Sequence, residues 1–349
     1  MCIRDRAYRL FYDEPVHIVR GEGVWLYDSE GRKYLDMYNN VPHVGHCHPR
    51  GVEAICEQAG KLNTHTRYLH ENVVTLAERL TAKLPDEIDT AMFCCTGSEA
   101  NELALRIARR CTGGTGIIVT DFSYHGNTQA IHEISTDTIP AADVPDYVVT
   151  VPAPDTYRGR HQGDDAGRRY AEYARAAIAT LEQRGIKLAA LVIDTIVSSS
   201  GVVAPPVGYL GAVAEIVRDA GGLFIADEVQ PGFGRTGRNF WGFEADGLVP
   251  DIVTMGKPMG NGHPLSAVVA RSELVREFAK HGRYFNTFGG NPVSCAAGLA
   301  VLDVIEDERL QQNALDVGTH LCDGLHTLAE THECIGDVRG SGLFLGVEL

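Results

Sequence analysis

A lysine follows directly on an apolar run in the stretch DIVTMGKPMGNGHP, residues 251–264. Lys257 has glycines and prolines as neighbours, rather than the polar, helix-favouring residues that surround an ordinary surface lysine. An amine that loses water at the end of a buried strand has a lowered pKa, and its neutral form is a nucleophile and a base. Lys257 is therefore a candidate for covalent or proton-transfer chemistry. The alternative is a solvated loop lysine.

A carboxylate, Asp227, lies near the end of the apolar run GLFIADEV, residues 222–229. An unpaired carboxylate in such surroundings is strongly penalised, so Asp227 must meet a cation or several hydrogen-bond donors. One possibility is a structural ion pair with an arginine such as Arg235. The other is a partnership with a protonated nitrogen of a ligand.

A third stretch, TGSEAN, places Gly97 and Ser98 at the expected start of a helix. Free backbone N–H groups at a helix N-terminus bind anions such as phosphate. The alternative is that Ser98 only caps the helix, which is worth about 1 kcal/mol. The order of residues around Lys257 is not that of a P-loop, in which the glycines precede the lysine.

Together the three stretches match the needs of a pyridoxal 5'-phosphate enzyme. Such an enzyme needs an anion site for the phosphate, a carboxylate that keeps the pyridine nitrogen protonated, and a lysine that binds the aldehyde carbon. Lys257 lies thirty positions after Asp227, on the next apolar run. The sequence therefore predicts that this cofactor binds here.

The elements that must position these residues alternate between apolar runs and amphipathic helical stretches. Because the runs are apolar on both faces, they indicate central strands of a mostly parallel sheet that helices cover. Ligands bind beyond the carboxyl ends of strands in such sheets, where all three stretches lie. The predicted strands are residues 90–95, 115–120, 188–194, 222–229, 251–256 and 265–270.

The domain organisation is predicted from the same patterns. Residues 1–60 contribute to a small domain, 61–295 form the large cofactor-binding domain, and 296–349 begin a C-terminal small domain that we expect to be incomplete. The alternating stretch GEGVWLYDSEGRKYLDMYNN predicts a hairpin outside the main sheet. The first six residues, MCIRDR, are unlike the rest, and we expect them to be foreign to the native protein.

Composition excludes several partners. The net charge of −15 disfavours nucleic acid and anionic membranes, which are bound by clustered Lys and Arg. No run of about 18 apolar residues is present to span a membrane. Nine cysteines without CxxC spacing favour reduced thiols and a cytoplasmic location. His43, His46 and His48 are close enough in sequence to suggest a metal site, but we expect no metal.

Several longer motifs resemble the class III aminotransferases of pyridoxal phosphate fold type I. The resemblance covers nearly the whole chain from about residue 15, in the family's order. It implies an α/β fold with a mostly parallel central sheet, helices on both faces, a smaller α+β domain truncated at the C-terminus, and a homodimer whose subunits share the active site. The motifs are CTGSEANELALRIAR, SYHGNT, DEVQPGFGRTG, DIVTMGKPMGNGHPL and FNTFGGNPVSCAAGLAVLDVIEDE.

The resemblance also implies roles for single residues. Lys257 would be the Schiff-base lysine, and Asp227 would be the partner of the pyridinium nitrogen. The other residues implied to bind the cofactor are Gly97 and Ser98 at its phosphate, Val229 on one ring face, Tyr124 on the other face beside His125 and Gly126, Gln230 at the phenolic oxygen, and Thr287 at the phosphate from the neighbouring subunit.

The expected reaction is transamination from an amine or amino acid to a keto acid, with Lys257 as the base. Further stretches, among them RYLHENVVTLAERL and PDTYRG, are similar to a branch that includes ethanolamine-phosphate phospho-lyases and alanine-glyoxylate aminotransferase 2-like proteins. The first alternative is therefore a phospho-lyase that eliminates phosphate and ammonia from an O-phosphorylated amino alcohol such as phosphoethanolamine. The second is a catalytically idle homologue that only binds the cofactor, which the presence of both Lys257 and Asp227 disfavours.

Overall fold

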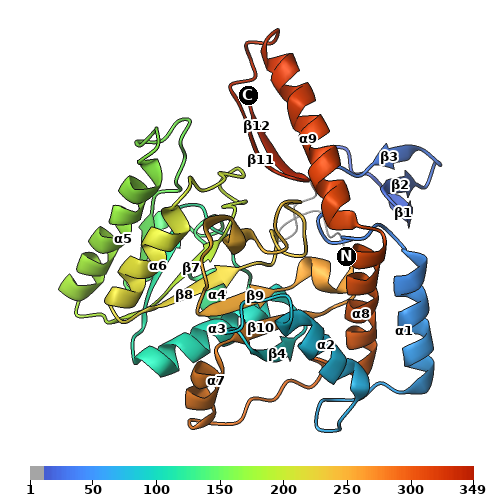
Figure 1. Cartoon of the computed structure of the whole chain (residues 1–349), viewed down its shortest axis with the longest axis horizontal. Helices are drawn as coiled ribbons and strands as arrows, with labels where there is room; N and C mark the ends of the chain where they lie inside the picture. The colour runs from blue at the N-terminus through green and yellow to red at the C-terminus, as the bar shows by residue number, and fades with distance from the viewer. Residues whose placement is uncertain (1–11) are drawn as a thin grey trace.

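The computed structural model describes residues 12–349, so the predicted foreign stretch MCIRDR lies outside the described residues. A seven-stranded sheet forms the centre of the molecule, in the order β4-β10-β9-β8-β7-β5-β6 (Figure 1). Neighbouring strands from β6 to β9 are parallel, and β10 is antiparallel to β4 and β9. The strands are β4 Thr90–Cys94, β5 Gly116–Thr120, β6 Val148–Val151, β7 Leu188–Asp194, β8 Leu223–Asp227, β9 Ile252–Met255 and β10 Ser266–Ala270.

All six predicted strands are present, and the mixed α/β fold with a mostly parallel sheet is confirmed. The seventh strand, β6, was not predicted; it lies at an edge of the sheet beside β5. Every residue of β5, β7 and β10 is buried, which explains why these runs lack polar alternation.

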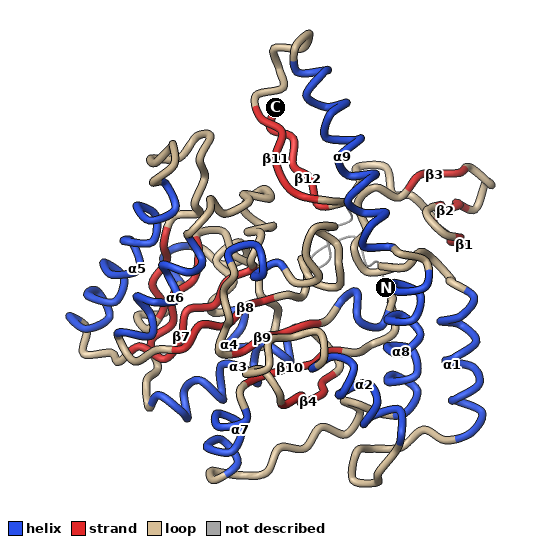
Figure 2. Tube along the Cα trace, viewed as in Figure 1, coloured by secondary structure: helices blue, strands red, loops and turns tan. Residues whose placement is uncertain are grey.

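Helices cover both faces of the sheet (Figure 2). Side chains along the strands divide between two hydrophobic clusters. Ile118 belongs to the cluster that includes side chains of α2, α5, α6 and α8, and Val119 belongs to the cluster that includes side chains of α3 and α7. The helices are α1 Pro49–Lys61, α2 Glu71–Thr81, α3 Gly97–Thr112, α4 Gln129–His132, α5 Ala166–Gln183, α6 Tyr209–Asp219, α7 Ser272–Ala279, α8 Pro292–Asp307 and α9 Leu310–Ala329, with 3₁₀ turns η1 Ala141–Asp143, η2 Gly242–Asp246 and η3 Lys257–Gly260.

Two small sheets flank this body. The predicted N-terminal hairpin is present as β2 (Trp25–Asp28) and β3 (Lys33–Leu35), and β1 (Ile18–Glu22) extends it. At the C-terminal end, α9 and the hairpin of β11 (Asp337–Ser341) and β12 (Phe344–Glu348) project away from the central sheet (Figure 1). The predicted domain boundaries fall inside α1 and α8, and the division stays a prediction.

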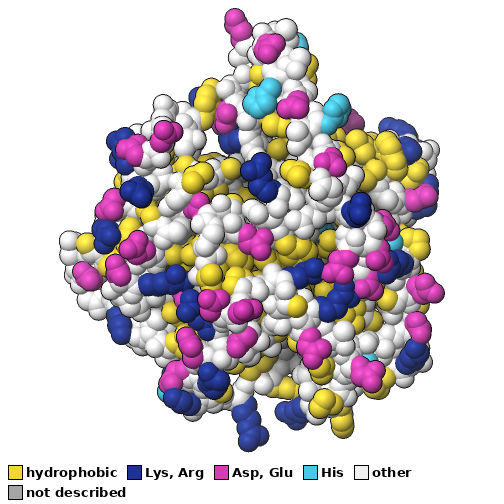
Figure 3. Space-filling view, viewed as in Figure 1, with side chains coloured by type: hydrophobic (Ala, Val, Ile, Leu, Met, Phe, Trp, Pro, Cys, Tyr) yellow, Lys and Arg dark blue, Asp and Glu magenta, His cyan; other side chains and the backbone are white. Residues whose placement is uncertain are grey.

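On the face shown in Figure 3, acidic and basic side chains are interspersed, and no large basic patch is visible. Of the helices that the structure describes, none combines the length and the apolar character needed to cross a membrane.

Candidate active site

A pocket lies where β7, β8 and β9 end, next to the start of α3. It brings together nine of the ten residues that the sequence predicted, and it adds Asp194, which was not predicted. Thr287 is not in this lining and lies exposed in the chain that follows α7. The residues that line the pocket are Gly97, Ser98, Tyr124, His125, Gly126, Asp194, Asp227, Val229, Gln230 and Lys257.

Asp227 is buried, with only 3% of its surface exposed, and its partners are donors rather than an arginine. Its Oδ2 accepts hydrogen bonds from Asn101 Nδ2 at 2.9 Å and His125 Nδ1 at 2.7 Å. Its Oδ1 accepts one from the backbone N–H of Val229 at 3.1 Å. Since a carboxylate oxygen can accept two hydrogen bonds, Oδ1 retains capacity for a donor in the pocket. The alternative ion pair with Arg235 is not formed, because that guanidinium contacts the ring of His43.

Two further residues fix this arrangement, and neither was singled out from the sequence. Thr254 Oγ1 donates to Asn101 Oδ1 at 2.6 Å, so the amide nitrogen of Asn101 must face Asp227 and the carbonyl of His125. Asn101 is 2% exposed on the face of α3 that packs on the sheet. The signal in the sequence was a polar side chain in the middle of the apolar face of a predicted helix.

His125 supports Asp227 and still has a free ring nitrogen. Its Nδ1 carries the proton, because the carboxylate that it faces can only accept. Its Nε2 is buried and has no hydrogen-bond partner among residues 12–349. A buried polar atom of this kind indicates a place where a bound group supplies the missing contact.

Lys257 starts the 3₁₀ turn directly after β9 and its glycine. No hydrogen bond or ion pair joins its side chain to the described part of the chain. Burial lowers the pKa of Lys257 from its ordinary value of 10.5, while the charges of Asp227 and Asp194 oppose this effect. The lowered pKa makes the neutral form of this amine, which is the form needed for covalent and base chemistry, easier to reach than in a solvated lysine.

The lowered pKa of Lys257 predicts a pH effect on stability of the cofactor-free protein. Below the lowered pKa the lysine is charged in both states, and folding bears the full cost of desolvating it. The unfolding free energy should therefore rise as pH increases through that pKa toward 10.5, by about 1.4 kcal/mol per unit of lowering. Denaturant titrations of wild type and Lys257→Met over this range check the effect, which the variant should lack. An equal pH dependence in both proteins would contradict it.

The start of α3 forms the third side of the pocket. Thr96 caps the helix, since its Oγ1 accepts from the backbone N–H of Glu99 at 3.2 Å, and the alternative role of Ser98 as the cap is wrong. The first N–H groups of the helix, at Gly97 and Ser98, have no acceptor within the helix. Ser98 Oγ instead accepts from the backbone N–H of Asn127 at 3.1 Å. The helix start is therefore open to an anion.

Gly126 closes over this helix start at a position where no side chain fits. Its φ is +138°, and an added Cβ would meet the Cα of Ser98 at 2.9 Å. Gly126→Ala should displace the Gly126–Asn127 backbone from Ser98 and weaken cofactor binding by about tenfold or more. Equilibrium dialysis of the cofactor measures this. Gly211→Ala, on α6 with open space around its Cβ position, is the control, and equal affinities in the two variants would contradict the prediction.

These residues fit pyridoxal 5'-phosphate. The helix start at Gly97 and Ser98 offers N–H donors to a phosphate, Asp227 offers an acceptor to a protonated ring nitrogen, and Lys257 offers an amine to the aldehyde. Val229 and Tyr124 supply apolar and aromatic surface on the lining. The structure shows that these residues line one pocket. The role of each residue toward the cofactor stays a prediction.

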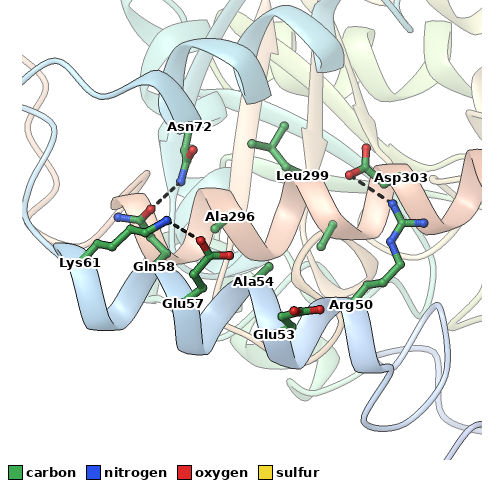
Figure 4. Close-up of a pocket in the computed structure, with 11 residues that line it drawn as sticks. Arg50, Glu53, Ala54, Glu57, Gln58, Lys61, Asn72, Ala296, Leu299 and Asp303 are labelled. Carbon is green, nitrogen blue, oxygen red and sulfur yellow. Dashed lines mark hydrogen bonds and ion pairs between the residues drawn. The ribbon is translucent and has the colours of Figure 1, made fainter.

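A second cavity has a volume of about 360 Å³ and is larger than this pocket, which has about 120 Å³. Its lining does not combine an unpaired amine, a buried carboxylate and a helix start. It lies between α1, α2 and α8 (Figure 4). Its charged side chains include mutually satisfied pairs, with Lys61 bonded to Glu57 and Arg50 at 3.5 Å from Asp303. Size alone would have selected the wrong cavity.

The three neighbouring histidines turn to different partners. His43 contacts the carbonyl oxygen of Phe233 at 2.6 Å, His46 contacts Asp36 at 2.7 Å, and His48 contacts Glu308 at 3.0 Å. Burial lowers the pKa of His43 to about 3. Each of the three histidine side chains therefore has a separate hydrogen-bond partner in the protein.

The sheet, the pocket at its strand ends and the donor set define an enzyme of pyridoxal phosphate fold type I. The sequence matches the family Aminotransferase class-III over residues 10–349, and the chain belongs to that family. It is therefore a pyridoxal phosphate-dependent enzyme.

Comparisons with individual proteins agree with this family membership. The chain is 46% identical to an alanine–glyoxylate aminotransferase 2-like protein of Drosophila melanogaster, over 99% of this chain and 72% of the relative. A solved phospholyase from Arthrobacter, in complex with phosphoethanolamine, is 46% identical with a TM-score of 0.93, over 97% of this chain and 80% of that chain. A solved (S)-enantioselective omega-transaminase from Thermomicrobium roseum is 33% identical with a TM-score of 0.86, over 99% and 82%.

Proposed function

We propose that the chain is a transaminase that transfers the amino group of a small amine or amino acid to a keto acid. The observation that carries the proposal is that the amine of Lys257, whose pKa is lowered by burial, and the carboxylate of Asp227 line one pocket, beside a helix start that can hold a phosphate. The family supports the same reaction class.

The residues of the chain would divide the work as follows. When bound, the cofactor serves as an electron sink for the charge left on the substrate carbon. Asp227 would keep a proton on the ring nitrogen, and Asn101 and His125 hold the carboxylate of Asp227 in place. Lys257, with its lowered pKa, takes the proton from the substrate carbon and later returns a proton.

A phospho-lyase is the second candidate, and a specific observation favours it. The solved phospholyase is 46% identical to this chain, whereas the solved omega-transaminase is 33% identical. Both reactions begin with the same proton transfer to Lys257. They would part afterwards: in the lyase a phosphate on the neighbouring carbon would leave, whereas in the transaminase Lys257 would return the proton.

One experiment separates the two reactions. The purified protein with cofactor is given phosphoethanolamine without an acceptor and, separately, an amino donor with pyruvate or glyoxylate. Keto-acid-dependent transfer of the amino group supports the transaminase. Release of phosphate without any acceptor selects the lyase. Lys257→Ala serves as the control in both assays, and it should show neither product.

We further propose a homodimer in which Thr287 completes the phosphate site of the neighbouring subunit. Support comes from the loop around Thr287, where the apolar side chains of Phe285 and Phe288 are 44% and 69% exposed. Exposed apolar side chains so close together in the sequence favour a contact with another chain. Light scattering measures the mass in solution, and a fully active monomer would contradict the proposal.

The proposed location is the cytoplasm. All eight cysteines within residues 12–349 are free thiols. Free thiols are typical of reducing compartments. Fractionation of cells that express the protein provides the test.

A further inference from the structure

A buried carboxylate that the mechanism does not use, Asp194, lies beside Asp227. The two residues are direct partners in the parallel register of β7 and β8, and Asp194 also lines the pocket. Asp194 is 7% exposed, and burial raises its pKa against the donors that surround it. A second carboxylate so near Asp227 is unfavourable unless it has a role or strong partners.

The partners of Asp194 all come from the turn that follows it. The backbone N–H groups of Ile196 and Ser198 donate to its two oxygens at 3.1 Å each, and the hydroxyl of Ser198 donates to Oδ2. The turn contains Val197 with a φ of +48°, a strained conformation for a β-branched residue. Asp194 thus holds a turn that would not adopt this shape alone.

The turn reaches the cofactor side of the pocket through Ser198. The Oγ of Ser198 accepts a hydrogen bond from Gln230 Nε2 at 2.5 Å, and Gln230 Oε1 accepts one from Asn40 Nδ2 at 2.6 Å. Because the only hydroxyl proton of Ser198 goes to Asp194, its oxygen can only accept from Gln230. The amide of Gln230 must therefore present its nitrogen, not its oxygen, to Ser198.

This orientation has a consequence for ligand binding. One N–H of Gln230 is given to Ser198, which leaves the second N–H for an acceptor in the pocket. With the amide reversed, the pocket would meet a carbonyl oxygen that repels an anionic oxygen. We propose that Asp194 is a positioning residue, which acts through the hydroxyl of Ser198 to fix the amide of Gln230 as a donor toward the phenolic oxygen of the cofactor.

This inference rests on the cofactor dependence of the proposed function, and a spectroscopic titration tests it apart from activity. The visible absorbance of the lysine-bound cofactor is followed against pH. A hydrogen-bond donor at the phenolic oxygen favours the ionised form of that oxygen. Loss of the donor should therefore raise the midpoint pH of the absorbance titration. Ser198→Ala is expected to raise it by about one pH unit, and Asp194→Asn is expected to raise it by less, because loss of the Asp194 charge beside Lys257 opposes the rise.

We call the hydrogen-bonded series Asp194–Ser198–Gln230 the relay. Control variants separate its effect from a general effect of charge or folding. In a Gln230→Ala background, Asp194→Asn should no longer raise the midpoint, because Asp194 and Ser198 then have no amide to orient. Asp251 is a buried carboxylate directly before β9, at the opposite end of that strand from Lys257, and Asp251→Asn should leave the midpoint at its wild-type value.

The outcomes are distinct. An upward shift in both variants, absent from the Gln230→Ala background, supports the relay. An upward shift in Asp194→Asn without one in Ser198→Ala, an upward shift that persists without Gln230, or no upward shift in either variant overturns it. If Asp194→Asn does not fold, the midpoint of Ser198→Ala decides. A wild type without any visible absorbance of bound cofactor overturns the proposed function together with the relay.

Discussion

Lys257→Ala is expected to lower turnover by about 10⁴-fold or more and to abolish the visible absorbance of the lysine-bound cofactor. Two functions are lost at once, the covalent tether and the base. Among the residues that line the pocket, Lys257 provides the only side-chain amine in the described part of the chain. The phosphate site is untouched, so the variant should still bind the cofactor noncovalently.

The matched control is Lys61→Ala. Lys61 belongs to the surface cavity of α1 and α8 and is paired with Glu57, so its loss should leave activity and absorbance close to those of wild type. Assays of turnover and absorbance spectra of both variants provide the comparison. Lys257→Ala with more than a hundredth of wild-type activity would mean that another group acts as the base.

Asp227→Asn should lower turnover by about 10²–10³-fold while the covalent bond to Lys257 still forms. The amide keeps the size of the side chain but removes the negative charge that holds a proton on the ring nitrogen. Because Asp227 is buried among Asn101, His125 and the backbone of Val229, no water replaces the lost charge easily. The signature is thus retained absorbance with lost turnover, the reverse of a binding defect.

Asn101→Ala gives the graded comparison for this prediction. It removes one of the donors that hold Asp227 but not the charge itself, so its effect should be smaller, about tenfold. Steady-state rates and cofactor titrations on both variants separate turnover from binding. An Asp227→Asn protein that works within threefold of wild type would show that the ring nitrogen needs no anionic partner here.

The central sheet could be predicted from the sequence because its strands are apolar on both faces and end in chemically distinctive residues. Lys257, Asp227 and the TGSEAN turn each mark a strand end, and parallel strands bring such ends to one edge. Strand β6 was missed because it is short and lies at the sheet edge, where the pattern is weaker.

The supporting residues could not be predicted, since their roles depend on contacts between distant parts of the chain. Asp194 looks like an ordinary end of an apolar run until the register of β7 and β8 places it beside Asp227. Asn40 reaches Gln230 across 190 positions of sequence. The cap of α3 was placed on Ser98 as an alternative, whereas the hydroxyl of Thr96 holds that position.

The central claim is that Lys257 is the residue that binds the cofactor covalently. Borohydride reduction of the cofactor-loaded protein makes that bond permanent, and peptide mass spectrometry then locates it. A single modified peptide that contains Lys257 is the predicted result. Modification of a different lysine, or none at all in a protein that carries stoichiometric cofactor, would contradict the account.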